Sequence, residues 1–147
     1  MESFFWIEPE VSGQLGPETE IDSTSYPPKL SYLHYRFDGW FGDDLVQSFP
    51  CFLVTERLAR ALTEAGISGI KIDDALVDKS ELFLELNPEL VLPAFKWLKP
   101  VGIHHIDDAG LMIIATPPQF DCKLVVSKKF LSVIRQFTFS KGKVFEV

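Results

Sequence analysis

The chain has 147 residues, which is enough for one domain with its own core and too few for two comfortable ones. Hydrophobic residues make up 46% of it and charged residues 24%, and Lys, Asp, Pro or Gly interrupts every apolar stretch before it could span a bilayer. The net charge of −7 disfavours nucleic acid as a partner and favours a basic protein. We therefore predict a single domain over residues 1–147 with no membrane partner.

The N-terminal part predicts one short strand followed by a long acidic loop. Residues 4–7 form an apolar run with no basic leader before it, so we expect no targeting peptide and a cytoplasmic location. Residues 9–28 are rich in Glu, Ser, Thr, Gly and Pro, which is typical of a loop. A loop of this length is either mobile or functional.

The next segment predicts a strand and then an acidic turn. Residues 30–37 alternate imperfectly with period two, so both faces of this strand are expected to be partly covered. Residues 38–44 combine glycine and aspartate, which indicates a turn, yet they also carry two large aromatic residues, Trp40 and Phe41.

One short phrase occurs twice, at residues 52–62 and again at residues 124–134. Each copy is an apolar run, then a hydroxyl residue, then a helical pattern. Thr55 and Ser127 are good N-caps because their side-chain oxygens accept from the free N–H groups of a first helical turn. Chance similarity explains the repeat more simply than a duplication, because the unit is common and the flanking sequences do not repeat.

The remaining pattern completes an α+β protein. Apolar residues recur at i, i+3, i+4 and i+7 after each N-cap, which predicts two amphipathic helices, and Gly66 is expected to end the first. Further short strands are predicted at residues 69–72, 81–86, 95–98, 111–115 and 143–147. Strands outnumber helices, and the helices follow separate strands. The sequence therefore predicts a mixed or mainly antiparallel sheet with two main helices.

Residues 104–108, His-His-Ile-Asp-Asp, form the densest group of ionisable side chains. Imidazole and carboxylate bind borderline metals, but adjacent His104 and His105 point to opposite faces of an extended segment, so this stretch offers two ligands at most. His34 would have to arrive from another strand to complete a site. A polar turn explains the stretch more simply, and we predict no metal and no cofactor.

Catalytic motifs do not occur in the sequence: it contains no Gly-x-Ser-x-Gly, no P-loop and no Gly-x-Gly-x-x-Gly. We therefore predict a protein without catalytic activity. Carboxylates from separate loops need no local motif, so a hydrolase stays open as the alternative. It would be metal-assisted or carboxylate-dependent and would use His34, His104 or His105 with Asp107 or Asp108.

Three Asp-Asp pairs follow apolar or glycine-containing segments, at residues 43–44, 73–74 and 107–108. Solvated turns, in which Asp binds its own backbone, explain them simply. Alternatively, they form an acidic rim around exposed aromatic anchors, which is the composition of a binding hot spot for a basic protein. Trp40 and Phe41 fit that role, although both could instead cover the core. The predicted partner-binding residues are Trp40, Phe41, Asp43, Asp44, Asp107 and Asp108.

Three phrases, at residues 48–58, 90–93 and 124–131, give the chain a family likeness. With them it resembles small uncharacterised bacterial proteins grouped with the immunity proteins of polymorphic toxin systems, over residues 48–137. The resemblance implies a cytoplasmic protein that binds and occludes a toxin domain. Some members of that group carry paired Cys-x-x-Cys elements that would bind zinc, and this chain has none.

Overall fold

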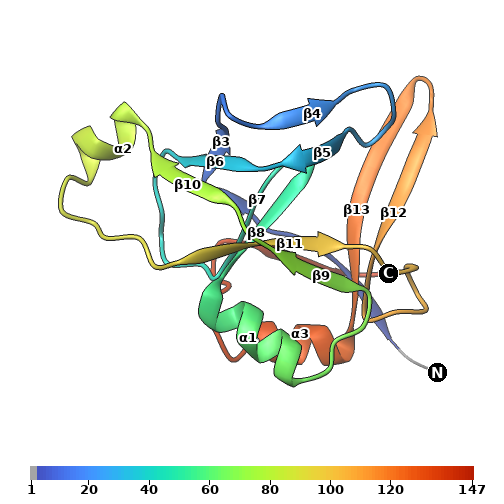
Figure 1. Ribbon diagram of the computed structural model, residues 1–147. Helices are drawn as coiled ribbons and strands as arrows, with labels where there is room; N and C mark the ends of the chain where they lie inside the picture. Colours follow the sequence, from blue (N-terminus) through green and yellow to red (C-terminus); the bar gives the residue numbers. More distant parts are fainter. Residues whose placement is uncertain (1–2) are drawn as a thin grey trace.

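The computed structural model describes residues 3–147, which form three helices and fourteen strands (Figure 1). The helices are α1 (Glu56–Glu64), α2 (Glu81–Leu86) and α3 (Lys128–Ile134). The strands are β1 (Phe4–Glu8), β2 (Glu10–Val11), β3 (Gly13–Leu15), β4 (Glu20–Asp22), β5 (Lys29–Tyr32), β6 (His34–Phe37), β7 (Leu45–Ser48), β8 (Cys51–Thr55), β9 (Ile70–Asp73), β10 (Leu76–Lys79), β11 (Phe95–Pro100), β12 (Ala109–Thr116), β13 (Gln119–Ser127) and β14 (Lys143–Glu146). The predicted α+β class is confirmed. Within residues 3–147, no helix is long and apolar enough to cross a membrane.

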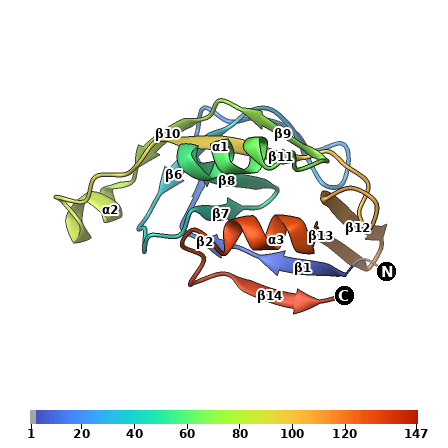
Figure 2. The ribbon, with the colours of Figure 1, turned by 90° about the horizontal axis from the view of Figure 1, so that it is seen from below.

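The two larger sheets have the same arrangement of a hairpin followed by a helix. One has the strand order β12-β13-β1-β14, and the other has the order β2-β7-β8-β11-β9. In each sheet an antiparallel hairpin leads directly into a helix, β7–β8 into α1 and β12–β13 into α3. Seen from below, α1 packs on the sheet of β8 and β11, while α3 packs beside it on the sheet of β13 and β1 (Figure 2).

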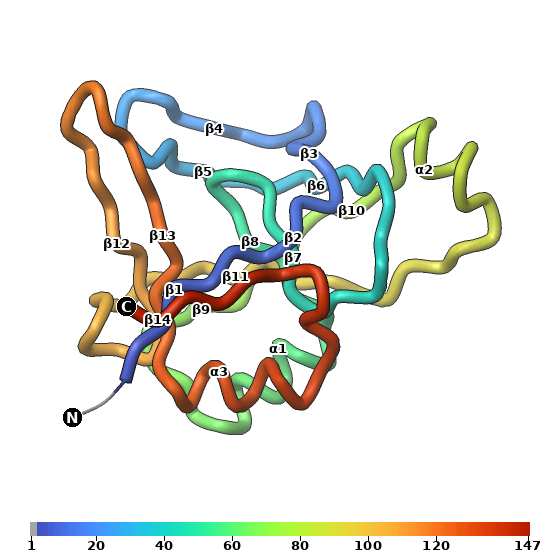
Figure 3. The backbone as a smooth tube through the Cα atoms, turned by 180° about the vertical axis from the view of Figure 1, so that it is seen from behind, coloured from blue at the N-terminus to red at the C-terminus, as the bar shows by residue number. Residues whose placement is uncertain are grey.

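The strand registers of the two sheets also coincide. The N-cap Thr55 faces Phe95 of β11, and the N-cap Ser127 faces Phe4 of β1. On the other side, β11 pairs antiparallel with β9, just as β1 pairs antiparallel with β14 (Figure 3). Strands β1 and β11 therefore hold equivalent places, and so do β14 and β9.

This equivalence exposes a second sequence repeat, at residues 4–9 and 95–100. The two stretches read Phe-Phe-Trp-Ile-Glu-Pro and Phe-Lys-Trp-Leu-Lys-Pro. The expectation that the flanking sequences do not repeat is therefore wrong. Each copy runs as a strand, a hairpin, a helix and a closing strand, and the first strand of each copy lies in the sheet of the other copy. The two copies of this repeat thus exchange their first strands.

Two apolar clusters fill the interior. The first lies between the two long helices and the two large sheets and includes Val54, Leu58, Val126 and Phe130. The second lies on the opposite face of β8 and includes Leu53, beneath the three-stranded sheet β10-β6-β3. Strand β8 is therefore buried on both faces, which accounts for its unbroken apolar run.

Two predicted elements are wrong. Residues 9–28 are not one long loop, because they contain β2, β3 and β4. Strand β3 pairs closely with β6, and a Cβ at Gly13 would clash with the carbonyl oxygen of Arg36. Residues 81–86 form helix α2 instead of a strand, because the Ser80 hydroxyl accepts from the Phe83 N–H at 3.2 Å and so caps a helical turn.

The N-caps predicted at Thr55 and Ser127 are confirmed, since their hydroxyls accept from Leu58 N–H at 3.3 Å and Phe130 N–H at 3.1 Å. Each hydroxyl also donates to an aspartate carboxylate. We expect Thr55→Ala and Ser127→Ala each to lower the free energy of unfolding by about 2 kcal/mol, because a cap and a charged hydrogen bond are lost together. Urea unfolding measures this difference.

The matched control for both variants is Ser80→Ala. Ser80 caps α2 through Phe83, but its side chain makes no bond to a carboxylate among the described residues. It should cost about 1 kcal/mol or less, the usual value for a cap alone. Equal losses at all three positions would contradict a role for the two aspartates.

Candidate docking surface

Asp44, predicted to lie on an exposed acidic rim, is buried with 1% of its surface exposed. Its Oδ1 accepts from the Thr55 hydroxyl at 2.5 Å, Arg57 donates to both carboxylate oxygens at 2.6 and 3.2 Å, and the N–H of Thr138 donates to Oδ2 at 3.0 Å. Burial by itself would raise the pKa of Asp44, but these hydrogen bonds outweigh it and hold the pKa below its usual range. The carboxylate therefore joins the start of α1 to the segment after α3.

Asp43 is also buried, and it binds the same C-terminal segment. Its carboxylate accepts from the N–H and the hydroxyl of Ser140 at 2.9 and 3.0 Å, and from the N–H of Lys141 at 2.9 Å. The prediction that Asp43 and Asp44 form a solvated docking rim is therefore wrong. Their turn is covered by residues that lie almost a hundred positions away in the chain.

Asp108 occupies the equivalent place in the other repeat. Its Oδ1 accepts from the Ser127 hydroxyl at 2.7 Å, and its Oδ2 accepts from the N–H of Ser68, beyond the end of α1, at 2.9 Å. Burial opposes ionisation here too, but the bonds from Ser68 and Ser127 lower the pKa of Asp108. Asp107 accepts from the N–H of Ile103 at 2.7 Å and closes a local turn. Both carboxylates are partly exposed and both bind backbone N–H groups of the fold, so their place on a docking rim stays a prediction.

The two neighbouring aromatic residues have different roles. Trp40 is partly buried, packs edge-on against Phe95 with 5.9 Å between ring centroids, and donates from Nε1 to the Asp43 carbonyl at 2.8 Å. It covers the second core, so the prediction of an exposed anchor is wrong for Trp40. Phe41, by contrast, has 71% of its surface exposed.

The three histidines do not converge on one site. His34 is buried on β6, where its Nδ1 accepts from the Glu18 N–H at 3.2 Å and its Nε2 lies 2.9 Å from Asp78. His104 and His105 contact each other at 2.8 Å in the loop after β11, across the molecule from β6 (Figure 1). Over residues 3–147, no three His, Cys, Asp or Glu side chains are grouped so that they could hold a metal ion. The three histidines therefore do not form the joint site that the alternative, a metal-assisted hydrolase, would use.

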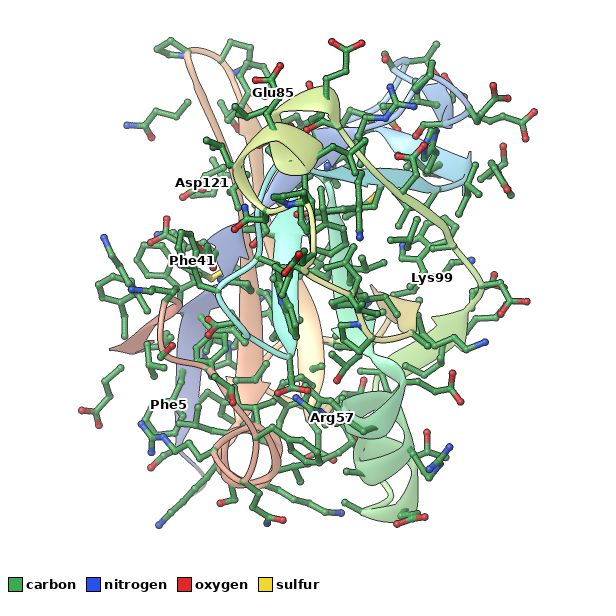
Figure 4. The ribbon with its side chains drawn as sticks, turned by 90° about the vertical axis from the view of Figure 1, so that its left-hand side faces the viewer. Phe5, Phe41, Arg57, Glu85, Lys99 and Asp121 are labelled. Atoms are coloured by element: carbon green, nitrogen blue, oxygen red, sulfur yellow. The ribbon has the colours of Figure 1, made fainter. Side chains whose placement is uncertain are left out.

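One group of exposed apolar side chains lies around α2, which projects from one end of the molecule (Figure 1). Others lie elsewhere, among them Ile103 and Ile106 in the loop after β11 and Ile113, Ile114 and Phe120 on the β12–β13 hairpin. Figure 4 looks onto this end, with Glu85 on α2 and Phe41 to one side of it. Phe41, Val11 and Leu86 line a hollow of about 300 Å³ whose polar members include Glu10 and Asp38. The aromatic ring of Phe41 is thus part of an apolar hollow next to carboxylates.

A larger groove lies on the other side of α2. It has a volume of about 810 Å³ and runs between strand β10 and the extended segment 91–94. Leu76, Leu84 and Val91 line it with 38%, 51% and 80% of their surfaces exposed. We name the two hollows together the α2 surface, which comprises Val11, Phe41, Leu76, Leu84, Leu86 and Val91.

The α2 surface has an acidic border. Residues 73–91 contain six carboxylates and a single lysine. That lysine, Lys79, donates to the carbonyl of Leu90 at 2.6 Å. Glu81, Glu85 and Glu89 are exposed, and none of them forms an ion pair within the described part of the chain. The other three carboxylates, those of Asp73, Asp74 and Asp78, pair with Lys99, Lys96 and Arg36. The three glutamates therefore provide the uncompensated negative charge of the border.

Sequence reasoning missed the leucines of α2 because residues 81–86 were interpreted as a strand. Leu and Glu are strong helix formers, and Ser80 stands where an N-cap belongs, so both local signals for a helix were present. Of the helix's residues only Phe83 is buried, which leaves the other apolar side chains in solvent.

No protein-family model matches the sequence, and a search of curated proteins finds no significant match. The resemblance to immunity proteins therefore stays a prediction. The α2 surface is identified by its exposure, its shape and its charge.

Replacing Asp44 by Asn should lower the free energy of unfolding by about 2 kcal/mol at neutral pH, the usual value of charged hydrogen bonds. The folded-state pKa of Asp44 is lowered, so its contribution is complete above the unfolded pKa of about 4 and is lost as the pH falls through the folded pKa. The gap between wild type and Asp44→Asn should therefore shrink below about pH 4. Urea unfolding at several pH values measures it, with Asp38→Asn as the control. A gap that stays constant with pH would contradict this role.

Trp40→Ala should lower the free energy of unfolding by about 2 to 3 kcal/mol, because a partly buried aromatic residue leaves a cavity against the core. Phe41→Ala should change it by less than about 0.5 kcal/mol, as expected for an exposed site. Thermal and urea unfolding of the two variants test the assignment. Equal effects would show that the two aromatic residues do not divide into a core residue and a surface residue.

Proposed function

We propose that this chain is a binding protein without catalytic activity of its own, and that it occludes a basic protein partner with the α2 surface. The observation that carries the proposal is the group of exposed apolar side chains around α2, bordered by Glu81, Glu85 and Glu89. An exposed apolar patch with a polar border is typical of a protein–protein interaction site.

The two parts of the surface would act at different steps of binding. The glutamates steer a basic partner toward α2, since charges on a rim act mainly on the rate of encounter. Phe41 and Leu86 then become buried under the partner and hold it, as aromatic and aliphatic anchors at the centre of an interface do. Occlusion requires no further chemistry from this chain.

The resemblance to immunity proteins gives the partner a finer description. On this proposal it is a bacterial toxin domain with a basic surface, which the chain meets in the cytoplasm. The acidic border of α2 supports a basic partner of this kind, because opposite charges at an interface favour the correct partner and repel others.

The test uses a toxin domain encoded beside the gene for this chain. Phe41→Asp and Leu86→Asp should each weaken binding of the purified toxin domain by at least about 30-fold, the loss typical of an interface anchor, and abolish protection of cells that express the toxin. Isothermal titration calorimetry and a growth assay measure the two effects. The matched control is Ile106→Asp, because Ile106 is as exposed as Phe41, at 71%, and lies in the loop after β11. Unchanged binding by Phe41→Asp would overturn the proposed surface.

A charge variant separates steering from anchoring. Changing Glu81, Glu85 and Glu89 together to Gln should slow association and flatten its salt dependence, and should leave dissociation nearly unchanged. Stopped-flow measurements at several salt concentrations check this. The control changes three exposed glutamates elsewhere, Glu8, Glu64 and Glu146, to Gln, so that the same net charge is removed. If both triple variants slow association equally, the border of α2 has no special role.

A further inference from the structure

The groove beside α2 lies where two neighbouring segments of chain separate. Strand β9 pairs antiparallel with β11, and their pairing stops at Asp73 and Trp97. Beyond that point the chain from β9 continues as β10, which pairs instead with β6 in parallel. The segment 91–94, which leads into β11, lies on the other side of the groove (Figure 1).

Strand β10 presents one unpaired edge to this groove. The N–H groups of Leu76 and Ser80 donate to carbonyls of Leu33 and Phe37 on the β6 side, both at 2.9 Å. Because successive residues of a strand direct their backbone groups to opposite edges, the N–H and C=O groups of Val77 and Lys79 face the groove. Over residues 3–147, β10 pairs with β6 alone. An edge with free backbone groups is a template for an added strand.

The far wall of the groove does not satisfy that edge. Pro93 has no N–H to donate, so its segment cannot continue a regular ladder toward β10. The neighbouring carbonyl, that of Ala94, accepts from the N–H of Glu56 at 2.8 Å and is therefore used on the side of α1. The groove stays open between these two stretches of backbone.

We propose that β10 accepts an extended, basic segment of the protein partner, which pairs with Val77 and Lys79 as an added strand. This proposal rests on the proposed function, and it names how that partner is held. Strand addition gives affinity through backbone hydrogen bonds, while side chains on one face of the added strand contact the apolar wall. Leu76, Leu84 and Val91 provide that wall.

Charge selects the occupant. Glu81, Glu85 and Glu89, which are exposed and form no ion pair among the described residues, favour a segment that carries Lys or Arg. They also disfavour a second copy of this chain as the occupant, because pairing two β10 edges would bring the same acidic stretch of each copy together. The single lysine of the stretch, Lys79, lies over the Phe83 ring at 5.1 Å and donates to the Leu90 carbonyl, and it forms no ion pair with these glutamates among the described residues.

The experiment follows individual backbone amides of the intact chain by NMR hydrogen exchange. In the free protein, the amides of Val77 and Lys79 should exchange rapidly, while those of Asp78 and Ser80 are protected by β6. The probe is a seven-residue peptide of alternating Lys and Val or Thr at millimolar concentration. It should slow exchange at Val77 and Lys79 by at least about tenfold, as expected when free amides enter a strand ladder.

Two control peptides separate backbone pairing from other binding. One carries Glu in place of Lys, and the other carries a methyl group on every backbone nitrogen, so neither should protect the two amides. Val77→Pro removes an N–H that faces the groove and leaves the bonds to β6, so it should weaken binding of the Lys peptide by about tenfold. Val77→Ala, which keeps the N–H, is its control. If Val77→Pro fails to fold, the methylated peptide on the wild-type chain decides the question.

The outcomes separate this proposal from the proposed function. Strand addition of a basic segment is overturned if no peptide slows exchange at Val77 and Lys79. It is also overturned if the Glu peptide or the methylated peptide slows exchange as much as the Lys peptide does.

If the two amides become protected as the protein concentration rises, with no peptide present, the occupant of the edge is a second copy of the chain. That result would also overturn the addition of a basic segment. A toxin domain that needs Phe41 but protects neither amide would leave the proposed function standing without strand addition. If the Lys peptide protects both amides but the toxin domain binds Phe41→Asp as tightly as wild type, strand addition stands and the proposed docking of the toxin domain at Phe41 is overturned.

Discussion

The two halves of the fold depend on a pair of aspartates that do the same work. Asp44 accepts from the N-cap Thr55 of α1 and from the backbone after α3, and Asp108 accepts from the N-cap Ser127 of α3 and from the backbone after α1. Each carboxylate lies near the positive end of one helix and satisfies backbone groups beyond the end of the other. Neither helix can therefore be displaced without breaking charged hydrogen bonds to both halves.

The exchange of first strands joins the two halves in a second way. Because β1 lies in the sheet of α3 and β11 in the sheet of α1, neither copy of the repeat closes its own sheet. The first copy also carries an insertion that the second lacks, residues 10–44, and residues 74–94 link the closing strand of the first copy to the first strand of the second. Between them these two segments supply the sheet β10-β6-β3, helix α2 and every side chain of the α2 surface. The candidate site is thus placed on a symmetric scaffold by the segments that break its symmetry.

Local signals were enough to predict the helices α1 and α3, their caps and the α+β class, because caps and apolar periodicity act within a few residues. The roles of Asp43 and Asp44 could not be predicted, because their partners Thr138 and Ser140 lie at the other end of the chain. The repeat of β1 in β11 was missed because unequal insertions separate the equivalent strands by different lengths of chain. Phe41 was predicted as an exposed anchor with a place over the core as the alternative, and its apolar neighbours depend on α2, which was interpreted as a strand.

The features that support the α2 end as the proposed binding site would also favour association of the free protein with itself. An open strand edge next to exposed leucines invites pairing with any extended chain, including another copy. Here the edge is short, it lies inside a groove, and the exposed Glu81, Glu85 and Glu89 follow it in the chain. Negative charge close to the edge opposes self-association, and on the proposed function it would also attract a basic segment. The specificity of the surface would then come mainly from its charge, and its affinity from the backbone and apolar groups beneath.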